Sequence, residues 1–427
     1  MARRSMYLDI PSARRSSYSS YGRESRHIFR KIAITLLVLV LLAIAGAAYQ
    51  LTRGIPAQHV RSSFASSIVA PGGATHMPWP REGQAAVAVA GGATIAYPAT
   101  GAKPAAIASL AKMMTAYLVL HDHPLNAGQA GPALRVTAAD VADYVQRAKQ
   151  QQSVLHVVAG ERLTEYKALQ ALLIPSANNV AAMLARWDAG SLTKFVARMN
   201  ATARALGLTD THYADPDGTS PSTVSTAADQ LVLAQKAMAE PIFAKIVRQP
   251  AATFPVAGTV FNYDYMIGHH GFIGIKTGSD AAAGGCWAFA AQRSVDGKST
   301  VVYGVVLGQH AKKSGALIQP ALNLGLRLAD ATPGVVKRVT LVTPHTVVGS
   351  LTAPWRDDVQ LVTQQAITVV AAPGQRYDAQ LHVSAPKEHS VATGAVVGTL
   401  TVAGVSTPVI VAGSAPGPTL KWRLTRL

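Results

Sequence analysis

Ser109 and Lys112 are the first residues along this chain whose types and spacing could do chemistry together. Residues three apart share one face of a helix, so the lysine amine can lie beside the serine hydroxyl. A serine hydroxyl is a weak nucleophile until a neighbouring base accepts its proton, and a lysine with a lowered pKa can be that base. If the pair opens a helix, free backbone N–H groups there also suit an oxyanion. Taken alone, such a pair is more often a serine N-cap beside a solvated lysine.

Two further motifs have polar side chains that could face the same cleft. Ser176 and Asn178 stand at a break between two helical stretches, where a helix N-cap is the simpler interpretation of an isolated tripeptide. Lys276 and Thr277 could hold a carboxylate, and Gly278 lets a substrate backbone approach an edge strand closely. The motifs follow the order S-x-x-K, S-x-N and K-T-G, with first positions 67 and then 100 residues apart. This order favours one acyl-transfer site over three unrelated local features.

The segments around these motifs predict a mixed α/β domain over residues 85–330. Apolar residues recur at helical spacing in several segments, while shorter apolar runs are typical of buried strands. Gly91-Gly92 separates two such runs and predicts a hairpin. The expected helices cover residues 107–120, 165–187, 192–206 and 226–239, and the expected strands cover 85–90, 93–97, 287–291 and 301–307.

Residues 335–427 predict a separate, small all-β domain. The helical pattern disappears after Gly334, and short β-rich runs separated by Pro or Gly take its place. These runs contain no cluster of catalytic residue types, so we interpret the domain as a spacer or a docking module for a partner. The expected strands cover residues 335–342, 359–361, 366–370, 379–383, 395–402 and 409–411.

The N-terminal region predicts a membrane anchor. Residues 1–31 hold eight basic residues against two acidic ones, and residues 32–49 follow without a charge. An apolar run of this length is near the minimum that spans a bilayer, and the basic flank predicts a cytoplasmic tail. Residues 50–84, rich in Pro, Gly and Ser, are then an expected linker to an extracytoplasmic domain. A cleaved signal peptide is the alternative, because Ala43-Ile44-Ala45 has a small-x-small pattern.

Four stretches around the motifs resemble the low-molecular-weight D-alanyl-D-alanine carboxypeptidases, which are serine penicillin-binding proteins. The resemblance spans about residues 85–310. It implies a penicillin-binding/β-lactamase-like transpeptidase domain of the α/β (α+β) class, followed by a β-rich domain. The stretches are ASLAKMMTAYL, AGERLTEYKALQALLIPSANNVAAMLA, YADPDGTSPSTVSTAADQLVLAQ and GIKTG.

The resemblance implies a role for each catalytic residue. Ser109 would be the acylated nucleophile and Lys112 its general base, while Ser176 would relay the proton to the leaving D-alanine. The reaction would remove the terminal D-alanine of a peptidoglycan pentapeptide, and β-lactams would acylate the same serine. No cofactor and no metal is implied.

The resemblance likewise implies a set of substrate-binding residues. The Asn178 amide would orient the substrate, Lys276 and Thr277 would bind its terminal carboxylate, and Gly278 would admit its backbone. The backbone N–H groups of Ser109 and Ser279 would form the oxyanion hole. One departure is a basic residue that some members place upstream of K-T-G, which is not evident in the segment Phe261-Asn262-Tyr263-Asp264.

Three alternatives share the fold but differ in chemistry. A class A β-lactamase needs a glutamate in an E-x-x-L-N loop, and Glu240 in EPIFA does not resemble one. A transpeptidase uses the same acyl-enzyme with an amine acceptor, which the sequence does not specify. A catalytically silent or regulatory wall protein would keep the fold, although retention of all three motifs argues against it.

Other functional classes find little support in the sequence. The formal charge of +17 suggests an anionic partner, but no basic stripe with interleaved aromatic residues accompanies it, so nucleic-acid binding is not expected. His121, His123, His269 and His270 show no metal-ligand spacing such as H-E-x-x-H. Cys286, the single cysteine, lies in an apolar run and is expected to be a buried core thiol.

Overall fold

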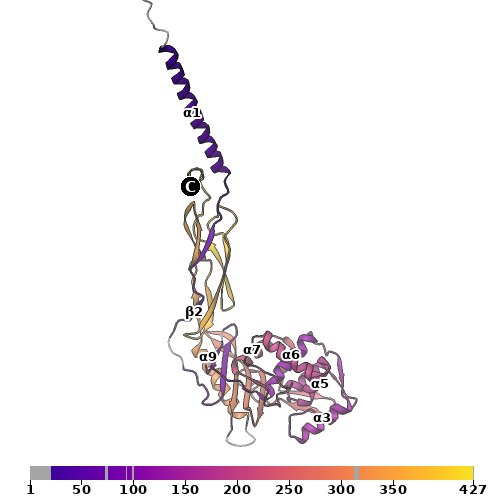
Figure 1. The fold of residues 1–427 in the computed structure, drawn as a ribbon. Coiled ribbons are helices and arrows are strands. Elements are labelled where there is room, and N and C mark those ends of the chain that lie inside the picture. Colours follow the sequence, from indigo (N-terminus) through magenta and orange to yellow (C-terminus); the bar gives the residue numbers. More distant parts are fainter. Residues whose placement is uncertain (1–20, 73–75, 93, 99–100, 312–316, 427) are drawn as a thin grey trace, which may run out of the picture.

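The computed structural model describes residues 21–72, 76–92, 94–98, 101–311 and 317–426. It arranges them as a long helix, an elongated β-rich body and a mixed α/β domain at the opposite end (Figure 1). Residues 1–20 of the expected basic tail lie outside the described residues.

The mixed domain is built on a five-stranded antiparallel sheet in the order β11-β12-β13-β3-β4. The expected hairpin is confirmed, with Ala85 opposite Tyr97, although its second strand is shorter than the apolar run 93–97. Strand β11, which contains the K-T-G motif, lies at one edge of this sheet. The strands are β3 (Gln84–Val89), β4 (Ile95–Tyr97), β11 (Phe272–Asp280), β12 (Gly284–Val295) and β13 (Lys298–Gln309).

Helices cover both faces of this sheet because its central strands alternate apolar side chains between two cores. Ala85, Val87 and Trp287 pack against α9 on one face. Ala86 and Ala288 pack into the larger core formed with the other helices. The helices of the mixed domain are α2 (Lys112–Asp122), α3 (Ala138–Lys149), α4 (Glu165–Leu173), α5 (Asn178–Ala189), α6 (Leu192–Ala205), α7 (Ala227–Met238), α8 (Pro241–Val247) and α9 (Gln319–Val335).

Short elements connect the helices around the site. A 3-10 turn, η1 (Ala108–Ala111), leads directly into α2. The apolar stretch 165–187 forms two helices, since Pro175 has no N–H to continue the ladder of α4. The remaining small strands pair as β5 (Ala105–Ala106) with β8 (Val224–Ser225), β6 (Ala133–Arg135) with β7 (Arg162–Thr164), and β9 (Ala251–Phe254) with β10 (Gly258–Phe261).

The β-rich body contains a seven-stranded sheet in the order β1-β15-β16-β20-β19-β18-β2, and β14 pairs separately with β17. The C-terminal region is rich in β-strands as expected, but it also contains a short helix near its end that was not predicted. One strand, β15, lies where none was expected. The strands from this region are β14 (Lys337–Val342), β15 (Val347–Ala353), β16 (Arg356–Thr363), β17 (Ile367–Ala371), β18 (Arg376–Val383), β19 (Val396–Val402) and β20 (Val405–Val411).

The expected linker, residues 50–84, is partly wrong. It contributes β1 (His59–Ser62), which pairs with β15, and β2 (Ser67–Val69), which pairs with β18. Strands of three or four residues leave no periodic signal in the sequence, and these two form only because the C-terminal sheet offers them edges. The β-rich body is therefore assembled from both ends of the chain.

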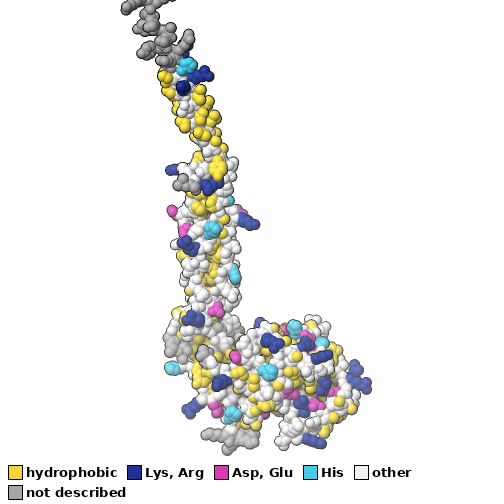
Figure 2. Space-filling model, viewed as in Figure 1, with side chains coloured by type: hydrophobic (Ala, Val, Ile, Leu, Met, Phe, Trp, Pro, Cys, Tyr) yellow, Lys and Arg dark blue, Asp and Glu magenta, His cyan; other side chains and the backbone are white. Residues whose placement is uncertain are grey.

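The N-terminal helix α1 (Tyr21–Thr52) contains the expected apolar run. Its segment Arg26–Thr52 is long and apolar enough to cross a bilayer, with a window of mean hydropathy 2.6. Figure 2 shows apolar side chains along its length. The chain's C-terminal end returns to the base of this helix through α10 (Leu420–Thr425), where Arg426 donates to the Gln50 carbonyl at 2.8 Å.

Candidate active site

The edge strand β11 packs against η1 at Gly278. A Cβ at this position would lie 2.8 Å from the Ser109 backbone nitrogen and 3.1 Å from Leu110 Cδ1. Only a residue without a side chain lets the strand come so close to the turn that holds Ser109. The glycine therefore sets the distance between the first and third motifs.

Replacing Gly278 with alanine should separate the strand from the turn and lower the rate of the acylation that the sequence predicts at Ser109. A misplacement of about 1 Å reduces a well-oriented reaction by roughly 10²-fold, and we expect a loss of that order. The rate of covalent labelling by a fluorescent penicillin measures it. Gly334→Ala is the matched control, because no atom lies within 4 Å of a Cβ built at Gly334. Equal labelling rates for the two variants would contradict the close-contact argument.

The first motif forms the contact expected from its spacing. Lys112 Nζ lies 2.8 Å from Ser109 Oγ and donates at 2.8 Å to the backbone carbonyl of Asp217. The lysine is fully buried, and this burial lowers the pKa of Lys112 to about 8, against the opposing effect of the Asp217 and Asp215 carboxylates. A buried amine with this pKa is mostly protonated near physiological pH but keeps a neutral fraction, and the neutral form can accept a proton from the serine hydroxyl.

The second motif occupies the break between α4 and α5. Ser176 is held at a φ of 61°, and its Oγ is buried with no hydrogen-bond partner among the described protein atoms. Asn178 Nδ2 donates to Gln152 Oε1 at 2.9 Å and to Thr219 Oγ1 at 3.3 Å, while its Oδ1 lacks a partner there. The next residue, Asn179, is buried and bonds to both the N–H and the carbonyl of Leu155. The motif therefore presents a free hydroxyl and a free amide oxygen.

The third motif lies along β11, opposite Trp287 on β12 at the level of Thr277. Lys276 is buried, and its Nζ donates to the Thr277 carbonyl at 2.8 Å. Burial holds the pKa of Lys276 well below its ordinary value, with a further lowering from Lys112 and an opposing effect from Asp264. Ser279 follows as an exposed residue.

The three motifs meet at one cleft with a volume of about 210 Å³. Five of the eight expected site residues line it, while Lys112, Asn178 and Lys276 are not part of this lining. Lys112 and Lys276 contact it directly, through hydrogen bonds to Ser109 Oγ and the Thr277 carbonyl. Four lining residues had no signal in the motif search. The lining residues are Ser109, Ser153, Ser176, Tyr263, Tyr265, Thr277, Gly278, Ser279 and Ile318.

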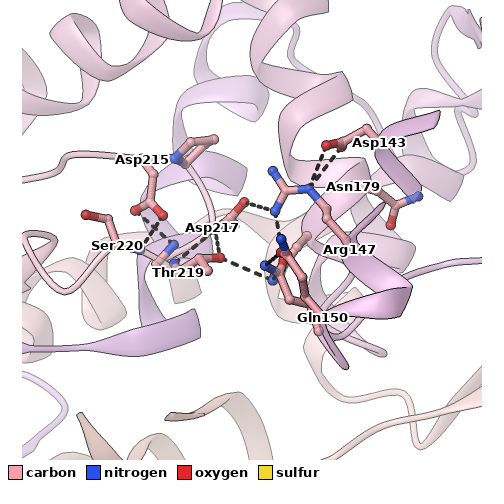
Figure 3. Close-up of polar contacts among 12 residues, drawn as sticks. Asp143, Arg147, Gln150, Asn179, Asp215, Asp217, Thr219 and Ser220 are labelled. Atoms are coloured by element: carbon pink, nitrogen blue, oxygen red, sulfur yellow. Dashed lines mark hydrogen bonds and ion pairs between the residues drawn. The ribbon is translucent and has the colours of Figure 1, made fainter. Parts of the chain in front are cut away.

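A partly buried ion pair lies next to Lys112. Arg147 on α3 contacts Asp217 at 2.9 Å and Asp143 at 2.9 Å, and Figure 3 shows it lying between these two carboxylates. Burial by itself would raise the pKa of Asp217, but Lys112 and Arg147 hold it below its ordinary value. Asp217 therefore places both a carbonyl and a negative charge beside Lys112.

Asp217→Asn should shift the pH dependence of the acylation predicted at Ser109 toward lower pH. The Asp217 charge favours the protonated form of Lys112, so its removal lowers the lysine pKa further below about 8 and frees the base at lower pH. We expect the acid limb of the acylation rate to move by about one pH unit. Asp143→Asn is the control, because Asp143 contacts Arg147 but is not among the charged groups that shift the pKa of Lys112. An unmoved acid limb in Asp217→Asn would contradict the electrostatic role of this carboxylate.

Neither the histidines nor the cysteine form a further reactive centre in the described part of the chain. Within the described residues, no three His, Cys, Asp or Glu side chains come together as metal ligands. His123 Nε2 instead lies 3.1 Å from Asp188 Oδ1. The expectation for Cys286 is confirmed, because the thiol is buried and this burial raises its pKa to about 12.

Comparisons with known proteins match the mixed domain. A family profile described as D-alanyl-D-alanine carboxypeptidase covers residues 82–310. The D-alanyl-D-alanine carboxypeptidase DacB2 of Mycobacterium tuberculosis is 35% identical over 209 residues, which are 47% of this chain and 67% of that protein. A D-alanyl-D-alanine carboxypeptidase of Streptomyces strain K15 is 32% identical over 217 residues, 47% of this chain and 71% of that protein.

Solved structures give the same result for the fold. The Streptomyces K15 DD-transpeptidase superposes with a TM-score of 0.51 at 25% identity, covering 60% of this chain and 98% of that one. The D-alanyl-D-alanine carboxypeptidase DacD of Francisella tularensis reaches a TM-score of 0.57 at 18% identity and covers 82% of this chain and 96% of that one. The second likeness extends beyond the mixed domain and concerns the fold alone.

Proposed function

This chain belongs to the D-alanyl-D-alanine carboxypeptidase family of serine penicillin-binding proteins, and we propose from that premise that it cleaves stem peptides through an acyl-enzyme on Ser109. The observation that supports this most is the 2.8 Å contact between Lys112 Nζ and Ser109 Oγ at the floor of the cleft. A nucleophile beside a base of lowered pKa is the arrangement that acyl transfer requires.

The proposed reaction has two steps. Ser109 Oγ attacks the carbonyl of the penultimate D-alanine while Lys112 accepts its proton, and the amide bond breaks. Ser176 relays a proton to the leaving amine of the terminal D-alanine, which departs as the free amino acid. Water then cleaves the ester on Ser109 and restores the hydroxyl. The free Oγ of Ser176 supports this role, since no other group in the described structure engages it.

The binding roles are proposals supported by position. The backbone N–H groups of Ser109 and Ser279 would stabilise the oxyanion. Asn178 has an unpartnered amide oxygen for the substrate N–H, and Thr277 lines the cleft where the terminal carboxylate would lie. Lys276 would act on that carboxylate by its charge, since its Nζ already donates to the Thr277 carbonyl.

We place the catalytic domain, residues 85–330, outside the cell membrane, as suits an enzyme of this family. Residues 32–49 within α1 are proposed as an uncleaved single-pass anchor following a basic cytoplasmic tail. The β-rich body then acts as the spacer between the anchor and the cleft (Figure 1). Membranes washed with high salt and carbonate should retain the full-length chain, whereas a shortened soluble form would indicate a cleaved signal.

The proposed activity is tested on the detergent-solubilised full-length chain. A pentapeptide ending in D-Ala-D-Ala should release free D-alanine, and a fluorescent penicillin should label the protein covalently. Failure of both would favour the catalytically silent alternative. Adding an amine acceptor distinguishes a carboxypeptidase from a transpeptidase, because cross-linked product in excess of free D-alanine would identify a transpeptidase.

A further inference from the structure

The segment Phe261–Tyr265 exposes its aromatic side chains and buries its polar ones. Phe261, Tyr263 and Tyr265 are 70%, 43% and 64% exposed, while Asn262 and Asp264 are 8% and 3% exposed. This reverses the usual distribution, in which large apolar groups face the core and carboxylates face water. Exposed aromatic groups beside a cleft are typical of a surface that recognises a ligand.

Hydrogen bonds of the two buried polar residues hold this segment in place. Asn262 Nδ2 donates to the Gln249 carbonyl at 3.1 Å, and its Oδ1 accepts from the Asp264 N–H at 2.9 Å. Asp264 in turn accepts from the Met266 N–H at 3.1 Å and from Trp287 Nε1 at 2.9 Å. Because the backbone on both sides of Tyr263 is anchored, the two tyrosines are preorganised for binding a ligand.

The anchored segment lies at the Lys276 end of the cleft. Trp287, which holds Asp264, sits opposite Thr277 in the sheet, and Asp264 is close enough to Lys276 to oppose the lowering of its pKa. Tyr263 and Tyr265 both line the cleft that contains Ser109. The Ser279 end is different, because Gly285, opposite Ser279, packs against the Leu317 carbonyl next to Ile318.

We propose that Tyr263 and Tyr265 form the subsite for the side chain of the released C-terminal residue. This inference rests on the proposed function, in which Lys276 and Thr277 receive the terminal carboxylate. A residue whose carboxylate lies at that end of the cleft projects its side chain next to the tyrosine rings. Since both rings are partly exposed, the subsite accepts D-residues with side chains larger than the methyl group of D-alanine, and it favours apolar ones.

The test compares peptides that differ only in the released residue. The full-length protein is assayed with substrates ending in D-Ala-D-Leu and D-Ala-Gly, and the ratio of their kcat/KM values is taken as the selectivity. Apolar contacts discriminate such side chains by roughly tenfold or more. We expect this ratio to fall about tenfold in the Tyr263→Ala, Tyr265→Ala double variant.

Two matched variants separate ring packing from other effects. The Tyr263→Phe, Tyr265→Phe double variant keeps both rings and should retain the wild-type ratio. Phe261→Ala removes a more exposed ring of the same segment that does not line the cleft, and it should also retain the ratio. A lowered ratio in either variant would overturn the assignment.

The outcomes distinguish this inference from the proposed function. A wild-type chain that releases neither residue overturns both. If the wild type releases both residues and the double alanine variant keeps the wild-type ratio, only the subsite is overturned. Both conclusions require that each variant unfolds at a temperature near that of the wild type. If the double alanine variant unfolds at a lower temperature, Tyr263→Ala and Tyr265→Ala are tested singly in its place.

Discussion

Ser109→Ala is expected to release no measurable D-alanine from a pentapeptide and to form no adduct with a β-lactam. The hydroxyl oxygen Oγ is the only side-chain atom of this residue that can form the ester, and Lys112 Nζ lies 2.8 Å from it. Loss of a nucleophile that acts as a unit with its base lowers kcat by about 10⁴-fold or more. Mass spectrometry of the intact protein after β-lactam treatment measures the adduct directly.

Other serines provide the controls for this substitution. Ser222 is exposed and away from the cleft lining, so Ser222→Ala should acquire the same adduct mass as the wild type. Peptide mapping then assigns the modified residue. An adduct that persisted in Ser109→Ala, for example on Ser153 or Ser176 in the same cleft, would overturn the assignment of the nucleophile.

Lys112→Met should lower the acylation rate by about 10² to 10⁴-fold, the range that general acid–base catalysis contributes. Methionine has a flexible, unbranched side chain and suits a fully buried position. It cannot accept a proton, so the substitution removes the base with little change in shape. The carbonyl of Asp217 also loses its donor, which we expect to lower stability by about 1–3 kcal/mol.

The pH profile of the wild type provides the independent check on Lys112. A base must be neutral to accept a proton, so the rate should fall as the pH drops below the lysine pKa of about 8 and level off above it. Lys112→Met should lose this limb along with the rate. Lys112→Arg, which keeps a positive charge that does not dissociate, should be equally slow. A fast Lys112→Arg variant would mean that the charge, and not the base, matters at this position.

Local features of the site could be predicted from short stretches of sequence. Ser109 and Lys112 are three residues apart, so any helical turn brings them together, and the hydrogen bond between them follows from that spacing. The break that presents Ser176 was visible because Pro175 interrupts an apolar helical run. The order of the motifs and their resemblance to a known family then allowed all three to be placed in one cleft.

Features that depend on distant partners were not predictable. Arg147 and Asp217 are 70 residues apart, and neither belongs to the S-x-x-K, S-x-N or K-T-G motif, so only the packing of α3 against the 215–220 loop identifies them as a pair. Tyr263 and Tyr265 are large aromatic residues of the kind that packs into a core, so their exposure was not predictable from the sequence. It follows from the anchoring of Asp264 by Trp287 on β12. Strands β1 and β2 exist because sheet edges more than 280 residues later in the chain accept them.

The sequence by itself determined the candidate nucleophile, its base and the helical and β-rich segments, because each depends on residues a few positions apart. The tertiary structure decided the pKa of the base, the side chains that surround the cleft and the strands that pair to form the β-rich body. Burial, ion pairing and sheet edges are properties of groups that meet only after the chain has folded. The lowered pKa of Lys112 is the clearest case, since its burial, Asp217 and Arg147 each come from a different part of the fold.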